Sequence, residues 1–586
     1  MLTEIRHQTE VCVVGGGLAG LCAAVACARH GAKTLLMHER PVLGGNASSE
    51  IRMWICGAHG NNNRETGIIE ELLLENQYRN PDKNYALWDS VLYSLAREQP
   101  GLTLLLNCTC MDGTMAGDRL ASIRGYQLTT QRFHRVEAEV FIDCSGDSIL
   151  APITGAPCRV GREARAEHGE SIAPAQADRK TMGLSCLIQA RKTREENVFI
   201  PPAWAKKKTR DMLAPYRLPD MDDPQENFWY LELGGDRDCI GDTEVLRDEL
   251  LAEAMGLWDY IKNDPANREK NRCWHLDWIG FLPGKRESRR YQGAYTLTQG
   301  DVEAGGRFDD LIAYGGWTMD DHHPGGLATP EPPNVFHPAP SPFGIPYRCL
   351  YSLAVPNLMF AGRNISATHA ALSATRVMAT CATLGQAAGT AAALAVRWGE
   401  GPDGVYRHHL RELQQALMDD DCYLPFHPRP VGSLTARTAM TAAGRDASVL
   451  KNGWDRPVGG QDNGVFLAPG EPLTLALPAP ELLHGLRLIL DSDLNRATLP
   501  ETRRGLMRPM PCNRPEDWPA SCVPQTLARL VRVEARMDGG WQQLAALEKH
   551  QRLVRIPLNV ETDALRVFFD ETWGAEEAHI SAADLW

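Results

Sequence analysis

The stretch from residue 11 to residue 39 constrains the fold more than any other part of the sequence. It begins with the apolar run VCVV at 11–14 and continues with Gly15, Gly17 and Gly20. The alanine-rich segment LCAAVACARHG follows at 21–31, and the run KTLLMHE then ends at Glu39. This order predicts a buried parallel strand, a glycine turn, a helix and a second strand that ends at an acidic residue.

Each part of this arrangement has a use in binding a dinucleotide. The first glycine allows a tight turn, the second lets the backbone approach a pyrophosphate, and the third lets the helix pack closely on the strand. The helix N-terminus faces the phosphates, and Glu39 is placed to accept hydrogen bonds from a ribose. A GxGxxG motif alone is a weak signal. Because strand, glycines, helix and acid fall in register here, we predict a dinucleotide-binding unit.

Three later segments bear on which dinucleotide is bound. RPVLGGNASS at 40–49 places Gly44 and Gly45 where backbone can pass close to a second part of the cofactor, for which a nicotinamide enzyme has no evident use. VEAEVFIDCSGDSILAPITG at 136–155 begins as a strand and runs into a polar turn at 143–147. NLMFAGRNISATHAALSATRVMATCATLGQAAGTAAALA at 357–395 has the pattern of a strand, a glycine turn, a loop and an Ala/Gly-rich helix.

Together these segments resemble the glutathione-reductase-type FAD flavoproteins, and more closely the FAD-dependent oxidoreductase family near the fumarate reductase flavoproteins. The resemblance is best over residues 10–160 and 280–400. It implies FAD as a non-covalent cofactor, since Asn46 stands near the place where a histidine would attach the flavin covalently. The first glycine motif would take the ADP half of FAD, and the strand that ends at Asp143 would close the first half of the cofactor domain.

The resemblance also assigns residues to the FAD site. The late turn at Gly362 and Arg363 would reach the ribityl chain, although Arg363 stands where many relatives have an acid. GQAAG at 385–389 resembles the start of the last cofactor-facing helix, whose N-terminus favours the anionic pyrimidine end of the reduced flavin. TLLLNCTC at 103–110 resembles the strand whose end brackets adenine. The expected cofactor-binding residues are Gly15, Gly17, Leu18, Ala19, Gly20, Glu39, Arg40, Gly44, Gly45, Asn46, Ser48, Cys110, Ser145, Gly146, Asp147, Gly362, Arg363, Gly385 and Gln386.

Candidate catalytic residues are arginines and histidines in the later segments. Arg289 and Arg290 could clamp a carboxylate or polar substrate; the alternative is that they are surface arginines paired with acids. Histidine is the side chain suited to proton transfer at neutral pH. The candidates are His322 and His323 in a Gly/Pro-bounded loop, with Asp320 to orient His322, His369 beside the late turn, and Arg376, for which helix packing is an equal alternative.

Several chemistries are disfavoured. The 16 cysteines show no metal-ligand spacing, so no metal site is expected. The CxxxxC spacing that we find near the glycine motifs lies inside the first predicted helix, which argues against dithiol chemistry, and Cys56 is only a weak candidate. The net charge of −13 argues against nucleic acid or an anionic membrane as partner. No apolar run reaches the roughly 18–20 residues of a membrane span. The polar N-terminus does not resemble a signal peptide, so a cytoplasmic location is expected.

From about residue 440 the pattern changes to short alternating strands separated by turn residues, such as EPLTLALP, HGLRLILDSDLN, RLVRIPLN and ALRVFFDETWG. This pattern predicts a β-sandwich. The segment resembles the galactose-binding-like (discoidin-type) jelly roll. Such a domain either binds sugars or packs on the enzyme and aids homo-oligomerisation.

The predicted fold class is α/β: a Rossmann-type FAD-binding domain (GR2-like) with an inserted α+β substrate domain and a C-terminal all-β sandwich. The expected boundaries are 1–160 and 341–400 for the FAD-binding domain, 161–340 for the substrate or cap domain, 401–439 for a helical linker, and 440–586 for the β-sandwich.

The expected function is that of an FAD oxidoreductase. A hydride would pass between flavin N5 and a polar small-molecule substrate, either sugar-like and carbohydrate-derived or a hydroxy acid, and the electron acceptor is not identified by the sequence. The preference for a sugar rests partly on analogy with the appended domain. One alternative is a flavin-dependent reductase of an activated C=C bond in an unsaturated acid. An alternative of another class is a non-catalytic, flavin-stabilised carbohydrate-binding protein.

Overall fold

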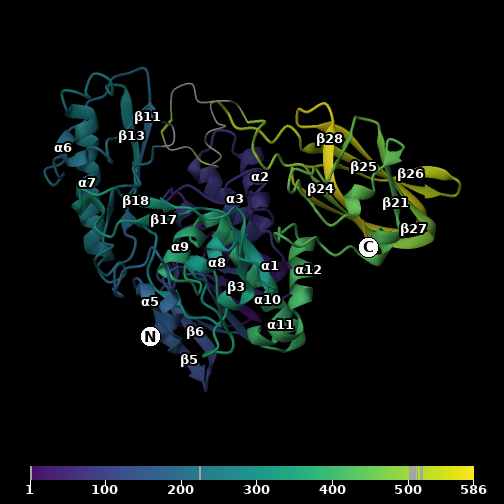
Figure 1. Cartoon of the computed structure of the whole chain (residues 1–586), viewed down its shortest axis with the longest axis horizontal. Helices are drawn as coiled ribbons and strands as arrows, with labels where there is room; N and C mark the ends of the chain where they lie inside the picture. Colours follow the sequence, from purple (N-terminus) through teal and green to yellow (C-terminus); the bar gives the residue numbers. More distant parts are fainter. Residues whose placement is uncertain (1–2, 224–225, 500–509, 511–512, 515–518) are drawn as a thin grey trace. The chain divides into compact units, whose positions relative to one another are not determined.

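The computed structural model describes residues 3–223, 226–499, 510, 513–514 and 519–586 (Figure 1). The chain divides into two compact units. The first contains Met1–Ala58, Lys83–Leu413 and Arg508–Pro519, and the second contains His59–Asp82, Gln414–Met507 and Ala520–Trp586. The segment at 59–82, which the sequence prediction placed in the FAD-binding domain, therefore belongs to the second unit.

The centre of the first unit is a five-stranded parallel sheet in the order β20-β8-β2-β3-β4. Strand β2 consists of the predicted run VCVV, and all of its residues are buried, as a strand covered on both faces requires. The predicted Rossmann-like α/β sheet is confirmed. The strands are β2 (Val11–Val14), β3 (Thr34–Met37), β4 (Leu102–Leu105), β8 (Val140–Asp143) and β20 (Leu358–Phe360).

Helices α1 (Leu18–Arg29) and α10 (Met378–Trp398) pack against each other beside this sheet. A Cβ at Gly385 would overlap the carbonyl oxygen of Ala19, so the glycine is needed for the close approach of the two helices. The prediction that a helix begins near Gly385 is wrong, because α10 starts at Met378 and Gly385 lies in its interior. By length and hydropathy α10 could cross a membrane, but 94% of its apolar window is buried within the fold.

A second sheet has the order β1-β7-β6-β5 and is made of β1 (Glu4–Gln8), β5 (Cys108–Ala116), β6 (Arg119–Gln127) and β7 (Arg132–Glu137). The segment TLLLNCTC, predicted as one strand, is divided between β4 in the parallel sheet and β5 in this one. The break is at Asn107, which has a φ of 54°. Asparagine tolerates this left-handed conformation better than most residues, so the chain can turn there from one sheet to the other.

The region between β8 and β20 contains small antiparallel sheets and one long helix, in line with the predicted α+β insertion. Trp258, Trp274 and Phe228 are among the side chains of its separate hydrophobic core. Its strands are β9 (Cys158–Arg159), β10 (Leu184–Ser185), β11 (Ile188–Lys192), β12 (Glu232–Leu233), β13 (Trp274–Ile279), β14 (Gly284–Lys285), β15 (Arg290–Tyr291), β16 (Leu311–Gly315), β17 (Met319–His322), β18 (Asn334–His337) and β19 (Phe343–Pro346).

The remaining helices of the first unit surround these sheets. They are α3 (Tyr85–Arg97), α4 (Leu150–Thr154), α5 (Arg165–His168), α6 (Arg210–Leu213), α7 (Thr243–Asn263), α8 (Gln299–Glu303), α9 (His369–Thr375) and α11 (Pro402–His408). Helix α12 (Leu410–Asp419) follows in the predicted linker.

The second unit is built on an eight-stranded antiparallel sheet with α2 (Ile68–Arg79) and α13 (Ser433–Arg437). The predicted strands are present, but neighbouring pairs join across local irregularities into long strands of 19 and 20 residues, β24 and β27. Glu70 of α2 forms a buried ion pair with Arg496 at 2.8 Å. The strands are β21 (Ala439–Ala442), β22 (Arg445–Asp446), β23 (Val465–Leu467), β24 (Pro472–Leu490), β25 (Ala528–Met537), β26 (Gly540–Glu548), β27 (Leu553–Thr572) and β28 (Ala578–Leu585).

Candidate active site

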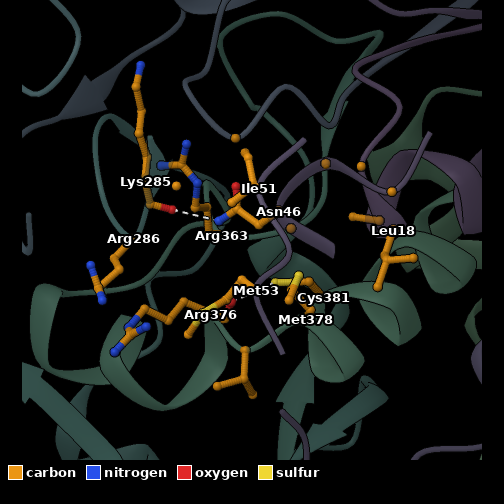
Figure 2. Close-up of a pocket in the computed structure, with 18 of the residues that line it drawn as sticks. Leu18, Asn46, Ile51, Met53, Lys285, Arg286, Arg363, Arg376, Met378 and Cys381 are labelled. Carbon is orange, nitrogen blue, oxygen red and sulfur yellow. Dashed lines mark hydrogen bonds between the residues drawn. The ribbon is translucent and has the colours of Figure 1, made fainter. Parts of the chain in front are cut away.

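A cavity of about 310 Å³ lies in the first unit where several strands of the parallel sheet end (Figure 2). Its lining includes residues 15–19 after β2, 38–40 after β3, 144–146 after β8 and 362–363 after β20. The carboxyl edge of a parallel sheet is the usual ligand site of such folds, and the volume is in the range of small-molecule pockets. Four segments that are far apart in the sequence thus meet at one cavity.

The three glycines of the first motif have distinct roles. Gly15 has a φ of 101°, and a Cβ there would lie 2.5 Å from the backbone of Cys144. A Cβ at Gly20 would overlap the carbonyl oxygen of Gly15, so only glycine lets α1 lie this close to β2. At Gly17 the nearest atom to a Cβ would be 3.9 Å away. The space above Gly17 is therefore open to a ligand at the N-terminus of α1.

The second glycine pair packs directly on this loop. The Gly44 amide donates to the Gly16 carbonyl at 2.8 Å, and a Cβ at Gly45 would lie 3.0 Å from the Gly17 Cα. Both Gly44 and Gly45 have positive φ angles, which bring the loop back over the first motif. The two glycine motifs form one continuous backbone surface on the cavity.

Strand β3 is followed by a polar pair at the cavity. The Gly16 amide donates to Nδ1 of His38 at 3.0 Å, and Nε2 of His38 lies 3.1 Å from the Val42 carbonyl, an arrangement that suits the tautomer with its proton on Nε2. Burial alone would raise the pKa of Glu39, but His38 and Arg40 lower it to about 2. Glu39 is therefore a carboxylate at neutral pH, and its side chain is 43% exposed.

Two cations that line the cavity share one carboxylate behind its wall. Lys285 Nζ and a terminal nitrogen of Arg363 each lie 2.7 Å from Asp147. Burial opposes ionisation of Asp147, but Arg363 and Lys285 hold its pKa well below the usual range. The Lys285 carbonyl also accepts a hydrogen bond of 3.0 Å from the Asn46 amide, drawn as a dashed line in Figure 2. This wall carries one more positive than negative charge.

Another part of the cavity is lined by His322, Asp320, Arg286 and Arg376. Nδ1 of His322 lies 2.7 Å from a carboxylate oxygen of Glu232, and Nε2 lies 3.2 Å from Asp320. Burial would raise the pKa of Asp320 and of Glu232, but the nearby cations lower both. The histidine is thus held between two carboxylates, an arrangement in which both ring nitrogens can donate hydrogen bonds.

Aromatic side chains complete this part of the lining. The Trp229 ring meets the His322 ring edge-on with centroids 5.2 Å apart. Trp54, Trp317 and Phe336 also line the cavity. A ligand here would contact apolar faces and a small set of charged groups, which is the usual composition of a small-molecule site.

Comparison with known proteins identifies the family. The model of the FAD-dependent oxidoreductase family matches residues 10–417. The chain belongs to this family. A search of curated proteins found no match.

Two of the solved structures with some similarity to this chain have the word reductase in their titles. One is a geranylgeranyl bacteriochlorophyll reductase-like protein from Thermoplasma acidophilum, with 12% identity over 71% of this chain and 88% of that chain and a TM-score of 0.32. Another is a mutant FrdA of E. coli quinol fumarate reductase, with 13% identity over 71% and 75% and a TM-score of 0.29.

A third is L-proline dehydrogenase from P. horikoshii, with 15% identity and a TM-score of 0.17. The match covers 25% of this chain and 24% of the dehydrogenase, so it spans about a quarter of the dehydrogenase. These low TM-scores carry no argument about substrate or mechanism.

The residues on the cavity fit FAD, the cofactor of this oxidoreductase. The open backbone at Gly17 and the N-terminus of α1 suit a pyrophosphate, and the ionised, partly exposed Glu39 suits a ribose. Of the residues predicted to bind FAD, the following line the cavity: Gly15, Gly17, Leu18, Ala19, Glu39, Arg40, Gly44, Gly45, Asn46, Ser145, Gly146, Gly362 and Arg363.

Six residues predicted for the FAD site do not line the cavity. Gly20 and Gly385 are glycines of close packing, and Asp147 acts through Lys285 and Arg363. The Ser48 hydroxyl donates to the Gly45 carbonyl at 2.7 Å, which supports the second glycine loop. The others, Cys110 and Gln386, are buried.

Some of the predicted catalytic residues line the cavity and others do not. His322 and Arg376 line the cavity, whereas His323 is exposed and its Nδ1 accepts a hydrogen bond from the Gly325 amide. Nε of Arg289 donates to the Asp147 carbonyl at 2.9 Å, and the buried Arg290 pairs with Glu163 at 3.1 Å. Neither arginine lines the cavity. Arg290 is therefore paired with an acid, as the alternative interpretation had it, but in the interior rather than at the surface.

His369 lies in a separate buried cluster. Its Nδ1 is 2.9 Å from Glu287, and its Nε2 is 3.0 Å from Asp321. Burial alone would lower the pKa of His369, but Glu287 and Asp321 raise it to about 10. A histidine that stays charged at neutral pH is suited to holding elements together rather than to proton transfer.

The sequence prediction missed Lys285, Arg286, Glu232 and Asn334. Lys285 and Arg286 lie just before Arg289 and Arg290, the pair that the sequence prediction selected. The prediction therefore identified the correct segment but selected the wrong residues within it. Asn334 lines the cavity and its amide donates to Asp320 at 2.6 Å. Glu232 and Asn334 lie in segments without a recognisable motif. Among the described residues no group of three or more His, Cys, Asp or Glu side chains could hold a metal ion.

Proposed function

We propose that this FAD-dependent oxidoreductase oxidises a hydroxyl-bearing carbon of a polar substrate, either a hydroxy acid or a sugar-like compound. The observation that carries the proposal is the buried His322 on the cavity wall, with Nδ1 bound to Glu232 at 2.7 Å and Nε2 in a longer contact with Asp320. FAD, when bound, supplies the acceptor or donor of the hydride.

The chain's own residues would position the substrate and move a proton. Glu232 fixes the orientation of the His322 ring, as the carboxylate does in a nucleophile–histidine–carboxylate triad. Nε2 of His322, with its longer contact, is the nitrogen that would exchange a proton with the substrate hydroxyl through displacement of Asp320. The aromatic lining would exclude water from the reacting carbon.

A second candidate function is the reduction of an activated C=C bond in an unsaturated acid. It is favoured by the placement of His322 between two carboxylates, because an ionised carboxylate can only accept a hydrogen bond from the ring. His322 would then deliver a proton to one carbon of the C=C bond, and the other carbon would receive the hydride. The family membership speaks against the third hypothesis, a non-catalytic carbohydrate-binding protein.

Anaerobic absorption spectroscopy tests the proposal. We expect the oxidised-flavin spectrum of the purified protein to bleach on addition of a hydroxy acid or sugar from a panel. The His322→Gln variant should keep its FAD and bleach more slowly by a factor on the order of 10²–10⁴, the usual contribution of a general acid or base.

The matched control is His323→Gln, because His323 is the next residue and is exposed. It should bleach at the wild-type rate. Reoxidation of dithionite-reduced protein by an unsaturated acid, without bleaching by any hydroxyl compound, would instead establish the second candidate. If His322→Gln and His323→Gln both behave as wild type, His322 has no role in proton transfer.

A further inference from the structure

Arg286 and Arg376 bring two guanidinium groups to one side of the cavity. Figure 2 shows both side chains at the left of the pocket, whereas Leu18, at the start of α1, lies at the right. The two arginines come from different elements: Arg286 follows β14, and Arg376 follows α9 and precedes α10. Their side chains are nine-tenths or more buried, with exposures of 7% and 10%.

The hydrogen bonds of these arginines leave donors available. Nη1 of Arg286 donates to the Ser185 hydroxyl at 2.9 Å and Nη2 to the Trp229 carbonyl at 3.0 Å. Nη2 of Arg376 donates to the carbonyl and carboxylate oxygens of Asp320 at 3.0 and 3.1 Å. Nε of Arg286 and Nε of Arg376 are buried and have no hydrogen-bond partner among the described residues. The bonds that are made fix both guanidinium groups in place, and the unused N–H groups remain for a ligand.

Two arginines and two carboxylates meet on this part of the lining. Arg286 and Arg376 contribute positive charge, and Glu232 and Asp320 contribute negative charge. Both carboxylates are shared with His322. A buried guanidinium whose N–H groups are not all paired is unfavourable, so the two arginines favour an anionic ligand.

The two arginines also repel each other. Burial lowers the pKa of Arg286, and the nearby carboxylate of Glu232 offsets part of this effect. The positive charge of Arg376 lowers the pKa of Arg286 further by repulsion. Two cations held close together in a buried place are stabilised by an anion that contacts both. Guanidinium groups match carboxylate and phosphate oxygens geometrically, and the neighbouring carboxylates of Glu232 and Asp320 repel a phosphate dianion more strongly than a singly charged carboxylate.

We infer that Arg286 and Arg376 bind the carboxylate of the substrate, so that the site takes hydroxy acids in preference to neutral sugars. This inference rests on the proposed function, whose substrate class it narrows. The sequence prediction placed a carboxylate clamp at Arg289 and Arg290, and the structure moves it to a different pair. The aromatic side chains Trp229, Trp317 and Phe336 would contact the carbon skeleton between the carboxylate and the reacting carbon.

Binding to the oxidised holoenzyme tests this inference without turnover. The probes are four pairs of compounds that differ in one carboxylate: glycolate and ethylene glycol, lactate and 1,2-propanediol, glycerate and glycerol, and gluconate and glucitol. Each is titrated into anaerobic holoenzyme while the flavin absorption is recorded. We expect at least one acid to give a saturable spectral change at a concentration about tenfold or more below its neutral partner, the effect of one charge-assisted contact.

Variants connect the effect to the two arginines. Arg286→Lys and Arg376→Lys keep the charge but lose the planar fork, so each should raise the Kd of the acid about tenfold or more and leave the neutral compound unaffected. The matched control is Arg289→Lys, because Arg289 lies close in sequence but outside the cavity lining. It should bind the acid as wild type does.

Several outcomes would overturn the inference. Equal binding of acid and neutral partner, no response to any acid, or unchanged Kd values in both lysine variants would show that the arginines do not bind a carboxylate. Loss of FAD from both variants, measured by their absorption at purification, would show that the arginines hold the cofactor instead. Because binding is read separately from bleaching, an acid that binds without reacting would contradict the proposed reaction and leave the carboxylate site established.

Discussion

The clearest test of how the fold holds FAD compares alanine substitutions at two glycines of the same motif. At Gly17 an added Cβ would meet nothing closer than 3.9 Å, and the backbone angles, φ −63° and ψ 178°, are accessible to alanine. The protein without FAD should therefore lose only the difference between glycine and alanine at a helix N-cap, about 0.5–1 kcal/mol. The added methyl group would, however, occupy space that the cofactor needs.

The effect on FAD should be larger than the effect on the fold. Forcing a methyl group into a closely packed contact costs on the order of 1–3 kcal/mol, which corresponds to a rise in Kd of about 5- to 150-fold. At Gly20 the added Cβ would overlap the Gly15 carbonyl, so α1 must move away from β2. Gly20→Ala should therefore destabilise the protein without FAD by about 1 kcal/mol or more, even after the better helix propensity of alanine.

Two measurements separate these effects. Thermal unfolding of the FAD-free protein reports on the fold, and quenching of flavin fluorescence on titration with FAD gives the Kd. The control is Gly300→Ala in α8, where a Cβ would meet nothing closer than 3.8 Å. The reasoning is refuted if Gly17→Ala binds FAD with the wild-type Kd, or if Gly20→Ala unfolds at the wild-type temperature.

Three further predictions concern other parts of the chain. Arg496→Met should destabilise the second unit by about 3–5 kcal/mol in urea unfolding, because it leaves Glu70 buried without its partner, and adding Glu70→Gln should recover part of the loss. Two neighbouring carboxylates raise the pKa of His369 from 6.5 to about 10, although burial opposes this. The resulting stabilisation is complete below pH 6.5 and is lost as the pH rises towards 10, so wild-type Tm should fall over this range more than that of His369→Gln. Gly385→Ala should raise the Kd for FAD although Gly385 is outside the cavity, because it pushes α10 against Ala19; an unchanged Kd would contradict this.

The parts of the fold that could be predicted are those fixed by local chemistry. The stretch 11–39 specifies its own strand, turn and helix, because the turn needs the positive φ of Gly15 and the Gly15 carbonyl leaves room only for glycine at position 20. The same holds for the loops at 44–46 and 362–363, whose glycines have positive φ. These residues line the cavity as expected.

The parts that could not be predicted depend on which distant segments pair. Arg286 directly follows β14, whose pairing with β10 brings this end of the segment to the cavity, whereas Arg289 donates to the Asp147 carbonyl and lies outside the lining. Glu232 reaches His322 through the pairing of β12 and β10 and the course of β17. No local pattern records these registers. Likewise nothing near α2 indicates that its partner Arg496 lies more than 400 residues later.

The place of α2 in the second unit has a consequence for synthesis of the chain. Residues 59–82 leave the ribosome roughly 330 residues before the next segment of their unit begins at Gln414, which at 5–20 residues per second is on the order of 15 s to 1 min. During that time Glu70 of α2, which is buried in the finished fold, lacks its partners Ser492 and Arg496. The first unit is therefore synthesised around a segment whose buried ion pair forms only after the second unit follows.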